Sequence, residues 1–366
     1  MVDPRMKKTR VLVIDNSRDV TGAFVSIVRS CSSLSERFEF EILLPSTSAC
    51  VDRVVAAGFA VHKLQMRELT RNIWHNLLYI PHLLINSRRL IRLLSSRSID
   101  LVVSNDFYNM LPPMCQIMGD RTPYITYVRF RPSHFPRWLT QIWLQAHHTR
   151  AKLLIAVSQV VRRELGDNRN VIVVNNEAPE VHVTYSQPSS NVILYPANYI
   201  NGKGQEVALR TFAKVQFDFP EWKLRFVGGT LGLRKNEEFK ARLKLMAARM
   251  GLDKSIEWRD FSDDMPREYQ EASFVLNFSK SESFSMTCLE ALYFGRAVIA
   301  TKSGGPEEIA DHGQSGFIAN NEVDICNSMA LLISSRDLLA RLSLKAYQMA
   351  RGKSSRQHIV SQLDSA

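Results

Sequence analysis

The sequence is poor in cysteine and has no long apolar run. Its five cysteines are scattered and form no Cys-x-x-Cys pair. An odd, dispersed set argues against a disulfide framework and a zinc site, and it favours reduced thiols in the cytosol. No apolar stretch reaches the roughly 20 residues that a membrane-spanning helix needs. The first expected strand, residues 10–15, begins too early for a secretory signal to precede it. These absences predict a cytoplasmic globular protein.

Internal repeats, low-complexity tracts and recognised nucleic-acid-binding modules are also missing. At 366 residues the chain is long enough for two domains, and its 45% hydrophobic and 23% charged residues are ordinary for a globular fold. We therefore expect a two-domain protein without a nucleic-acid partner.

Acidic residues are scarce in the N-terminal half. Residues 1–185 hold 24 Lys and Arg against 15 Asp and Glu, whereas residues 186–366 hold 23 against 21. The basic excess is densest in the segment 62–97, where seven basic residues and many apolar side chains stand with one acid, Glu68. Such a segment suits an anionic membrane surface. An ordinary surface helix with an apolar stripe toward a sheet explains the pattern equally well.

Apolar strand patterns alternate with helical patterns along nearly the whole chain. This alternation predicts an α/β protein with parallel sheets. The segment 176–191 lacks periodicity and contains Pro179 and Pro188, so we interpret it as the connection between two domains. The expected strands are residues 11–15, 40–44, 60–64, 101–104, 124–128, 153–157, 171–174, 192–195, 223–227, 255–258, 273–278 and 297–301.

Two glutamates, Glu282 and Glu290, lie where the apolar run 273–278 passes through a short loop into a helical pattern at 286–294. The N-terminus of such a helix offers free N–H groups and a positive dipole end, which suit a phosphate. Glu282 in the loop can accept hydrogen bonds from the hydroxyls of a bound group. Glu290, about one turn inside the helix, suits a vicinal diol such as a ribose. A diphosphate between two polyols is a nucleotide sugar, although two surface glutamates would give the same pattern.

The segments 195–215 and 279–319, which contain these glutamates and several glycine turns, resemble the retaining glycosyltransferases of family 4. The resemblance implies the GT-B fold, in which two Rossmann-like, doubly wound parallel-sheet domains face a central cleft. We expect an acceptor-binding domain at 1–178, a linker at 179–191 and a domain binding the nucleotide sugar at 192–345. The resemblance also implies that residues 346–366 form a helix crossing back to the N-terminal domain.

The family assigns roles to the two glutamates. By resemblance, Glu282 contacts the donor sugar and Glu290 holds the ribose. Serine stands at position 285, where the family usually has glycine. The remaining donor-binding positions in this loop are Ser283, Phe284, Ser285 and Met286.

Other donor contacts follow two earlier strands. In the family an Arg and a Lys clamp the departing diphosphate. Lys203 matches the Lys, but Asn198 stands at the Arg position and cannot neutralise charge. Gly228 and Gly229 resemble the glycine turn where the backbone approaches the nucleotide, although simple turn geometry explains a Gly-Gly pair as well.

In the N-terminal half, Thr21 and Gly22 match the loop that the family places near the donor phosphate and the acceptor. Arg129 occupies the position where many relatives have a His that contacts the donor sugar. An Arg there could bind sugar hydroxyls or an acidic acceptor, but it is a poor base at neutral pH. An Arg that pairs with a local acid explains the position equally well.

The sequence contains no Asp-x-Asp triplet, the oxygen-ligand pattern with which many enzymes hold a nucleotide sugar through a divalent ion. We therefore expect metal-independent chemistry with no cofactor, and name Glu282, Lys203 and Arg129 as the catalytic candidates. The resemblance implies retention of anomeric configuration, with a phosphate oxygen of the leaving group accepting the acceptor's proton. His147-His148 and Asp263-Asp264 are interpreted as surface helix and turn residues.

Taken together, these features predict a cytosol-facing hexosyltransferase. It moves a sugar from UDP- or GDP-sugar to a glycan or lipid-linked acceptor in cell-surface polysaccharide or lipopolysaccharide assembly. Two alternatives remain open: a nucleotide-sugar 2-epimerase, which can use the same fold, and a non-catalytic nucleotide-sugar-binding protein at the membrane surface.

Overall fold

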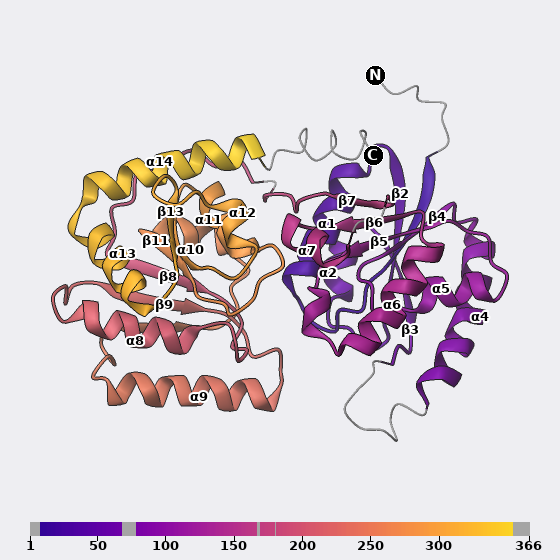
Figure 1. Ribbon diagram of the computed structural model, residues 1–366, viewed down its shortest axis with the longest axis horizontal. Helices are drawn as coiled ribbons and strands as arrows, with labels where there is room; N and C mark the ends of the chain where they lie inside the picture. Colours follow the sequence, from indigo (N-terminus) through magenta and orange to yellow (C-terminus); the bar gives the residue numbers. More distant parts are fainter. Residues whose placement is uncertain (1–7, 68–77, 167–168, 180, 354–366) are drawn as a thin grey trace. The chain divides into compact units, whose positions relative to one another are not determined.

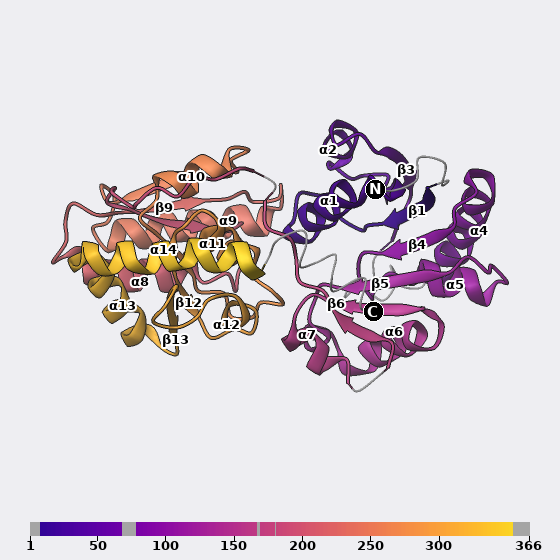
Figure 2. The ribbon, with the colours of Figure 1, turned by 90° about the horizontal axis from the view of Figure 1, so that it is seen from above.

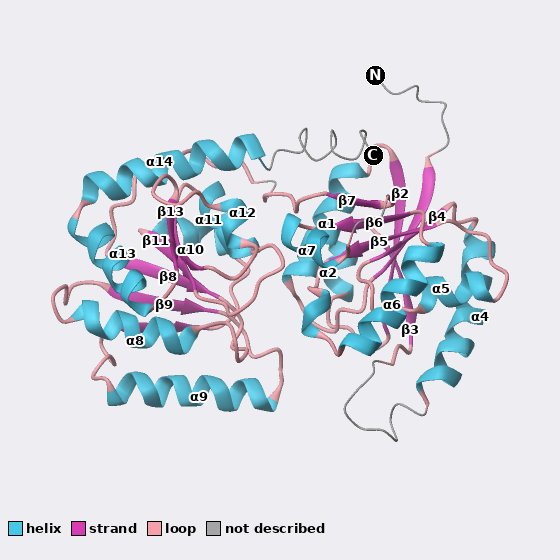
Figure 3. Cartoon of the chain, viewed as in Figure 1, coloured by secondary structure: helices cyan, strands magenta, loops and turns pink. Residues whose placement is uncertain are grey.

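The computed structural model describes residues 8–67, 78–166, 169–179 and 181–353, and these form two compact α/β units (Figures 1 and 3). The first unit runs to Glu177 and the second begins at Ala178. Each is a twisted parallel sheet with helices on both faces (Figure 2).

The first unit has a seven-stranded parallel sheet in the order β3-β2-β1-β4-β5-β6-β7. Its strands are β1 (Thr9–Ile14), β2 (Phe38–Pro45), β3 (Ala60–Leu64), β4 (Leu101–Ser104), β5 (Tyr124–Val128), β6 (Leu153–Ala156) and β7 (Val171–Val173). Its described helices are α1 (Gly22–Leu34), α2 (Val51–Ala56), α4 (Tyr79–Arg97), α5 (Leu111–Ile117), the 3-10 turn η1 (Pro132–His134), α6 (Arg137–Arg150) and α7 (Gln159–Glu164).

The second unit has a six-stranded parallel sheet in the order β10-β9-β8-β11-β12-β13. Its strands are β8 (Val192–Pro196), β9 (Lys223–Val227), β10 (Ile256–Arg259), β11 (Phe274–Asn277), β12 (Ala297–Thr301) and β13 (Gly316–Ala319). Its described helices are α8 (Gln205–Gln216), α9 (Arg234–Arg249), α10 (Met265–Glu271), α11 (Met286–Tyr293), α12 (Pro306–Ile309), α13 (Glu322–Ser334) and α14 (Arg336–Lys353).

Local sequence explains these elements. Strand β11 is buried along its whole length, as expected for a parallel strand covered by helices on both faces. Side chains cap several helix starts: Asp264 accepts from the Arg267 N–H at α10, and Asn321 accepts from the Asp324 N–H at α13. The predicted α/β class with two parallel sheets is confirmed, and every expected strand is present with bounds shifted by at most a few residues.

Two details differ from the sequence reading. The edge strand β13 is not among the expected strands, because it begins with a glycine, which is unfavourable in strands, and only three apolar residues follow. The interpretation of His147 as a surface residue is wrong: its side chain is fully buried on α6, where Nδ1 lies 2.9 Å from the Thr126 hydroxyl. Burial lowers the pKa of His147 to about 3, so this imidazole stays neutral.

The expected linker packs on the second unit. The Tyr185 hydroxyl donates to the Ala340 carbonyl at 3.2 Å, and the Tyr347 hydroxyl donates to the Val183 carbonyl at 2.9 Å. Both contacts join this segment to α14. Residues 354–366, which include most of the predicted crossing helix, lie outside the described residues.

The basic segment 62–97 is described in part, because residues 68–77 lie outside the described residues. Helix α4 buries a stripe that includes Leu90 and Leu94, and it exposes Ile80, Ile85 and a basic run. That exposed run consists of Arg88, Arg89 and Arg92. Within the described part of the chain, no helix is long and apolar enough to cross a bilayer.

Candidate functional site

The residues predicted to bind the donor lie in loops that follow adjacent strands of the second unit. Asn198 and Lys203 follow β8, Gly228 and Gly229 follow β9, and Glu282 follows β11. In the sheet β8 lies between β9 and β11, and all three strands are parallel. Their carboxyl ends therefore meet at one edge, the usual location of a ligand in a doubly wound sheet.

At this edge the Lys203 ammonium contacts Glu282, with Nζ 2.8 Å from Oε1. The Lys203 side chain is 35% exposed and the Glu282 side chain 15% exposed. The Glu282 N–H donates to the Ser303 carbonyl, and the Gly305 N–H donates to the Glu282 carbonyl, both at 3.0 Å. The loop after β11 is thus tied to the loop after β12.

Tyr195 holds the backbone that carries Lys203. This fully buried tyrosine donates its hydroxyl to the Lys203 carbonyl and accepts from the Phe278 N–H at 3.0 Å. Gly204, which follows Lys203, has φ +81°, and a Cβ there would lie 2.1 Å from the Phe278 carbonyl oxygen. Only glycine allows the two loops to approach so closely.

Ser285 resolves the departure from the family's glycine. Its φ of 77° and ψ of 81° place it in the left-handed region that glycine usually fills. Its Oγ accepts from the Cys288 N–H at 3.3 Å and from Asn277 Nδ2 at 2.8 Å. The serine therefore adopts a backbone conformation that glycine usually fills, and it caps the N-terminus of α11.

Asn198, which stands at the position of the family's Arg, hydrogen-bonds to the neighbouring loop and to the start of α8. Its Oδ1 accepts from the Gly229 N–H at 3.0 Å, and its carbonyl accepts from Gln205 Nε2 at 2.9 Å. A Cβ on Gly228 would lie 2.1 Å from the Ala197 carbonyl oxygen. Asn198 therefore joins the loops after β8 and β9, which approach each other backbone to backbone.

Glu290 lies on α11, and the Tyr269 hydroxyl donates to its Oε2 at 3.1 Å. Three residues that hold the site, Tyr195, Tyr269 and Asn277, were missed by sequence reasoning. Their hydrogen-bond partners lie between eight and 83 residues away in the chain, so no local pattern identified them.

Three of the predicted residues, Thr21, Gly22 and Arg129, belong to the first unit. Thr21 caps α1, accepting from the Phe24 N–H at 3.2 Å, and Gly22 is the first residue of the helix. Arg129 follows β5 and is only 6% exposed. It donates to the Ser26 hydroxyl at 2.9 Å and to Asn176 Oδ1 at 2.6 Å.

The Arg129 guanidinium also donates to Asn105 Oδ1 and lies 4.6 Å from the centroid of the Tyr127 ring. Its Nη2 has no hydrogen-bond partner among the described residues. Burial lowers the pKa of Arg129. Its contact with a sugar or an acceptor stays a prediction.

Asp106, which follows β4, was not singled out from the sequence. Burial raises the pKa of its carboxyl to about 8, although it accepts from the Phe107 N–H at 2.9 Å and from the Phe130 N–H at 3.2 Å. Desolvation of the charged form outweighs these two bonds. Over the residues that the structure describes, no group of three or more His, Cys, Asp or Glu side chains is placed to hold a metal ion.

Two family models match the chain. The model described as Glycosyltransferase Family 4 matches residues 20–176, and the model described as Glycosyl transferases group 1 matches residues 180–349. Between them they cover most of the sequence and divide it near the boundary of the two structural units.

Curated relatives match over part of their length. An uncharacterized glycosyltransferase of Methanocaldococcus jannaschii is 25% identical over 195 residues, which are 52% of this chain and 52% of that protein. Lipopolysaccharide 1,2-N-acetylglucosaminetransferase of Salmonella typhimurium is 30% identical over 131 residues, which are 35% of this chain and 34% of that enzyme. The chain thus spans about half or less of the length of these relatives.

A solved structure matches over nearly the whole chain. HepE of Anabaena, in a crystal structure with UDP and glucose, superposes with a TM-score of 0.83 at 18% identity, covering 98% of both chains. At this identity the likeness establishes the fold.

Proposed function

The chain belongs to the group 1, family 4 glycosyltransferases, and from this premise we propose that it transfers a hexose from a nucleotide sugar to a glycan or lipid-linked acceptor. The observation that carries the proposal is the 2.8 Å contact between Lys203 and Glu282 beside the capped start of α11, with Glu290 farther along the same helix. One cation, a helix N-terminus and two carboxylates match a diphosphate between two polyols.

In the proposed site Lys203 and the first N–H groups of α11 bind the diphosphate as negative charge develops on it. Glu282 accepts hydrogen bonds from the hydroxyls of the donor sugar, and Glu290 accepts them from the ribose. Arg129, in the first unit, is a candidate for binding a sugar hydroxyl or an acidic acceptor. Asn198 acts by holding the loop that carries these groups, which leaves Lys203 as the cation assigned to the leaving group.

The proposed reaction is retaining and metal-independent. The bond between the anomeric carbon and the phosphate oxygen breaks, and the acceptor oxygen bonds to the same face of that carbon. The acceptor's proton passes to the departing phosphate oxygen, so the step balances without a side-chain base. Metal independence is proposed because the sequence lacks an Asp-x-Asp triplet.

Donor, acceptor and location are parts of the same proposal. The HepE complex contains UDP, which supports a UDP-sugar, and a GDP-sugar remains the other candidate. The Salmonella relative acts on lipopolysaccharide, which supports a cell-surface glycan. We place the protein on the cytoplasmic face of the membrane, where the exposed side of α4, with Ile80, Ile85 and Arg88, would contact anionic lipid.

A donor panel tests the proposal. Purified protein is mixed with UDP- and GDP-sugars, with EDTA or with Mg²⁺, and followed by thermal shift and by release of nucleoside diphosphate. We expect one donor to raise the melting temperature and to be hydrolysed slowly under both conditions. Donor binding with neither hydrolysis nor transfer to any acceptor offered would indicate the non-catalytic alternative. Conversion of the donor to its 2-epimer would indicate the epimerase. Failure of every donor to bind refutes the proposal.

A further inference from the structure

Helix α10 brings Tyr269 against the segment that carries Glu290. Besides the bond from its hydroxyl to Glu290 Oε2, the Tyr269 ring stacks on Phe294 with centroids 5.2 Å apart and planes 6° apart. The Tyr269 carbonyl accepts from Arg296 Nε at 2.8 Å. Because Glu290 and Phe294 are four residues apart, they lie on one side of α11 and its continuation. The Tyr269 ring, when stacked on Phe294, therefore places its hydroxyl within hydrogen-bond distance of Glu290.

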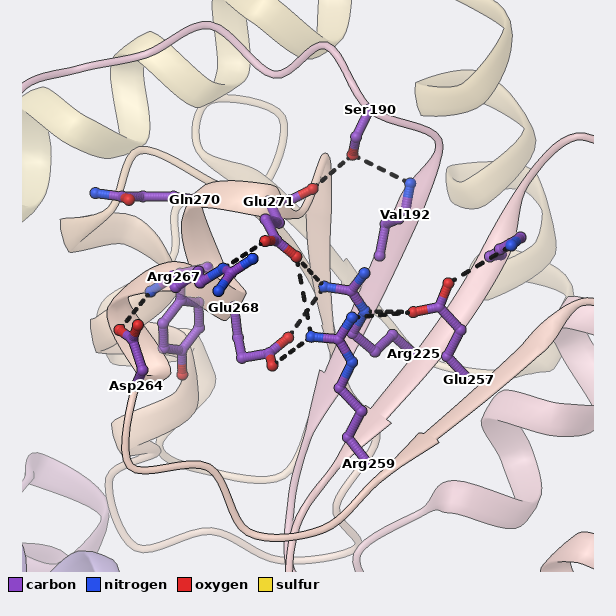
Figure 4. A network of polar contacts seen from close by, with 12 residues as sticks. Ser190, Val192, Arg225, Glu257, Arg259, Asp264, Arg267, Glu268, Gln270 and Glu271 are labelled. Atoms are coloured by element: carbon purple, nitrogen blue, oxygen red, sulfur yellow. Dashed lines mark hydrogen bonds and ion pairs between the residues drawn. The ribbon is translucent and has the colours of Figure 1, made fainter.

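A charge network with the buried Arg225 and Glu268 at its centre, drawn in Figure 4, holds α10 in place. Arg225 of β9, whose side chain is 6% exposed, donates to Glu268 at 3.0 Å and to Glu271 at 2.8 Å. Arg259 of β10 donates to Glu268 at 2.7 Å. Arg225 and Glu268 are both buried, so removing either would leave the other as an uncompensated charge, and this pair resists displacement. The position of Tyr269 is set by this network on one side and by Phe294 and Arg296 on the other.

We propose that Tyr269 is a positioning residue for ribose recognition. Its hydroxyl fixes one oxygen of the Glu290 carboxylate and thereby sets the direction in which the carboxylate meets the two ribose hydroxyls. Tyr269 is itself 1% exposed, so it acts through Glu290 and does not touch the ligand. The inference rests on the proposed function, because it requires a nucleotide whose ribose is bound by Glu290.

The test separates recognition of ribose from folding. Affinities of UDP and GDP, and of their 2′,3′-dideoxy forms, are measured by calorimetry for the wild type, Tyr269→Phe and Glu290→Gln. Tyr269→Phe removes only the hydroxyl and keeps the stacked ring. Tyr293→Phe is the matched control, because it removes a hydroxyl from α11 that donates to the Val181 carbonyl at 2.8 Å instead of to the site. Thermal unfolding without ligand monitors the fold of each variant.

We expect the wild type to prefer the ribose form of one nucleotide. Tyr269→Phe should lose about 2- to 10-fold of that preference, because the change misorients Glu290 without removing its own contact with the ribose, and the affinity for the dideoxy form should be unchanged. Tyr293→Phe should keep the whole preference. An undiminished preference in Tyr269→Phe overturns the inference and leaves the proposed function standing. Equal loss for both ligand forms also overturns it, since that result shows a structural role. No binding of UDP or GDP to the wild type refutes both.

Discussion

Replacing Glu282 by glutamine should have opposite effects on the free nucleotide and on the nucleotide sugar. The Lys203 ammonium forms an ion pair with Glu282, with Nζ 2.8 Å from Oε1. A diphosphate that takes up Lys203 must weaken this contact. With exposed fractions of 35% and 15%, solvent screens the pair, and such pairs contribute about 0.5–1 kcal/mol. Glu282→Gln should therefore raise the affinity for UDP or GDP by about 2- to 5-fold.

For the nucleotide sugar the same substitution removes a carboxylate that accepts from a sugar hydroxyl. Hydrogen bonds to charged groups are worth about 1.5–3 kcal/mol, which is more than the about 0.5–1 kcal/mol that the ion pair between Lys203 and Glu282 contributes. The affinity for the donor should therefore fall while the affinity for its nucleoside diphosphate rises. Calorimetric titration of the wild type and of Glu282→Gln with each ligand measures both changes in affinity directly.

A second carboxylate of the same unit provides the control. Glu322 forms an ion pair with Arg210 that joins α13 to α8, and it is not one of the predicted donor-binding residues. Glu322→Gln should leave both affinities unchanged. If Glu282→Gln leaves the affinity for UDP and GDP unaltered or reduces it, Lys203 does not exchange Glu282 for the diphosphate, and the assignment of this cation is wrong.

Three further changes test other parts of the description. Glu290→Ala should weaken nucleotide binding by about 1–3 kcal/mol through the lost ribose contact, measured by calorimetry; unchanged affinity would remove Glu290 from the site. Gly228→Ala places a Cβ 2.1 Å from the Ala197 carbonyl oxygen and should lower the free energy of unfolding by about 1–3 kcal/mol in urea titrations, a loss that an undisturbed loop would not show. For Asp106 the folded pKa of about 8 lies above that of an unfolded Asp, so the folded state binds the proton more tightly. Its contribution is complete below about pH 4 and is lost as pH rises toward 8, by up to about 1.4 kcal/mol per pH unit. Asp106→Asn should flatten this dependence in unfolding experiments between pH 5 and about 8. A slope unaffected by the substitution would mean that Asp106 is ionised in the native protein.

Much of the fold could be predicted from sequence because parallel strands buried on both faces are continuous apolar runs, and glycine turns mark their ends. The same local patterns identified Lys203, Glu282 and Glu290, since each lies in a loop or helix start with a recognisable sequence. The four-residue edge strand β13 and the burial of His147 were not predicted. Glycine at the start of β13 weakens the strand pattern, and burial of a helix residue depends on what packs against the helix.

The amino-acid sequence by itself determined the alternation of strands and helices, the positions of the loops predicted to bind the donor and the identity of their charged residues. The tertiary structure alone decided which of them meet. Lys203 and Glu282 are 79 residues apart and touch because β8 and β11 are neighbours in the sheet. The same folding directs the Asn198 amide to Gly229 and the Tyr269 hydroxyl to Glu290. Hydrogen bonds depend on distances of a few ångströms between segments remote in the chain, and no local pattern of residues encodes those distances.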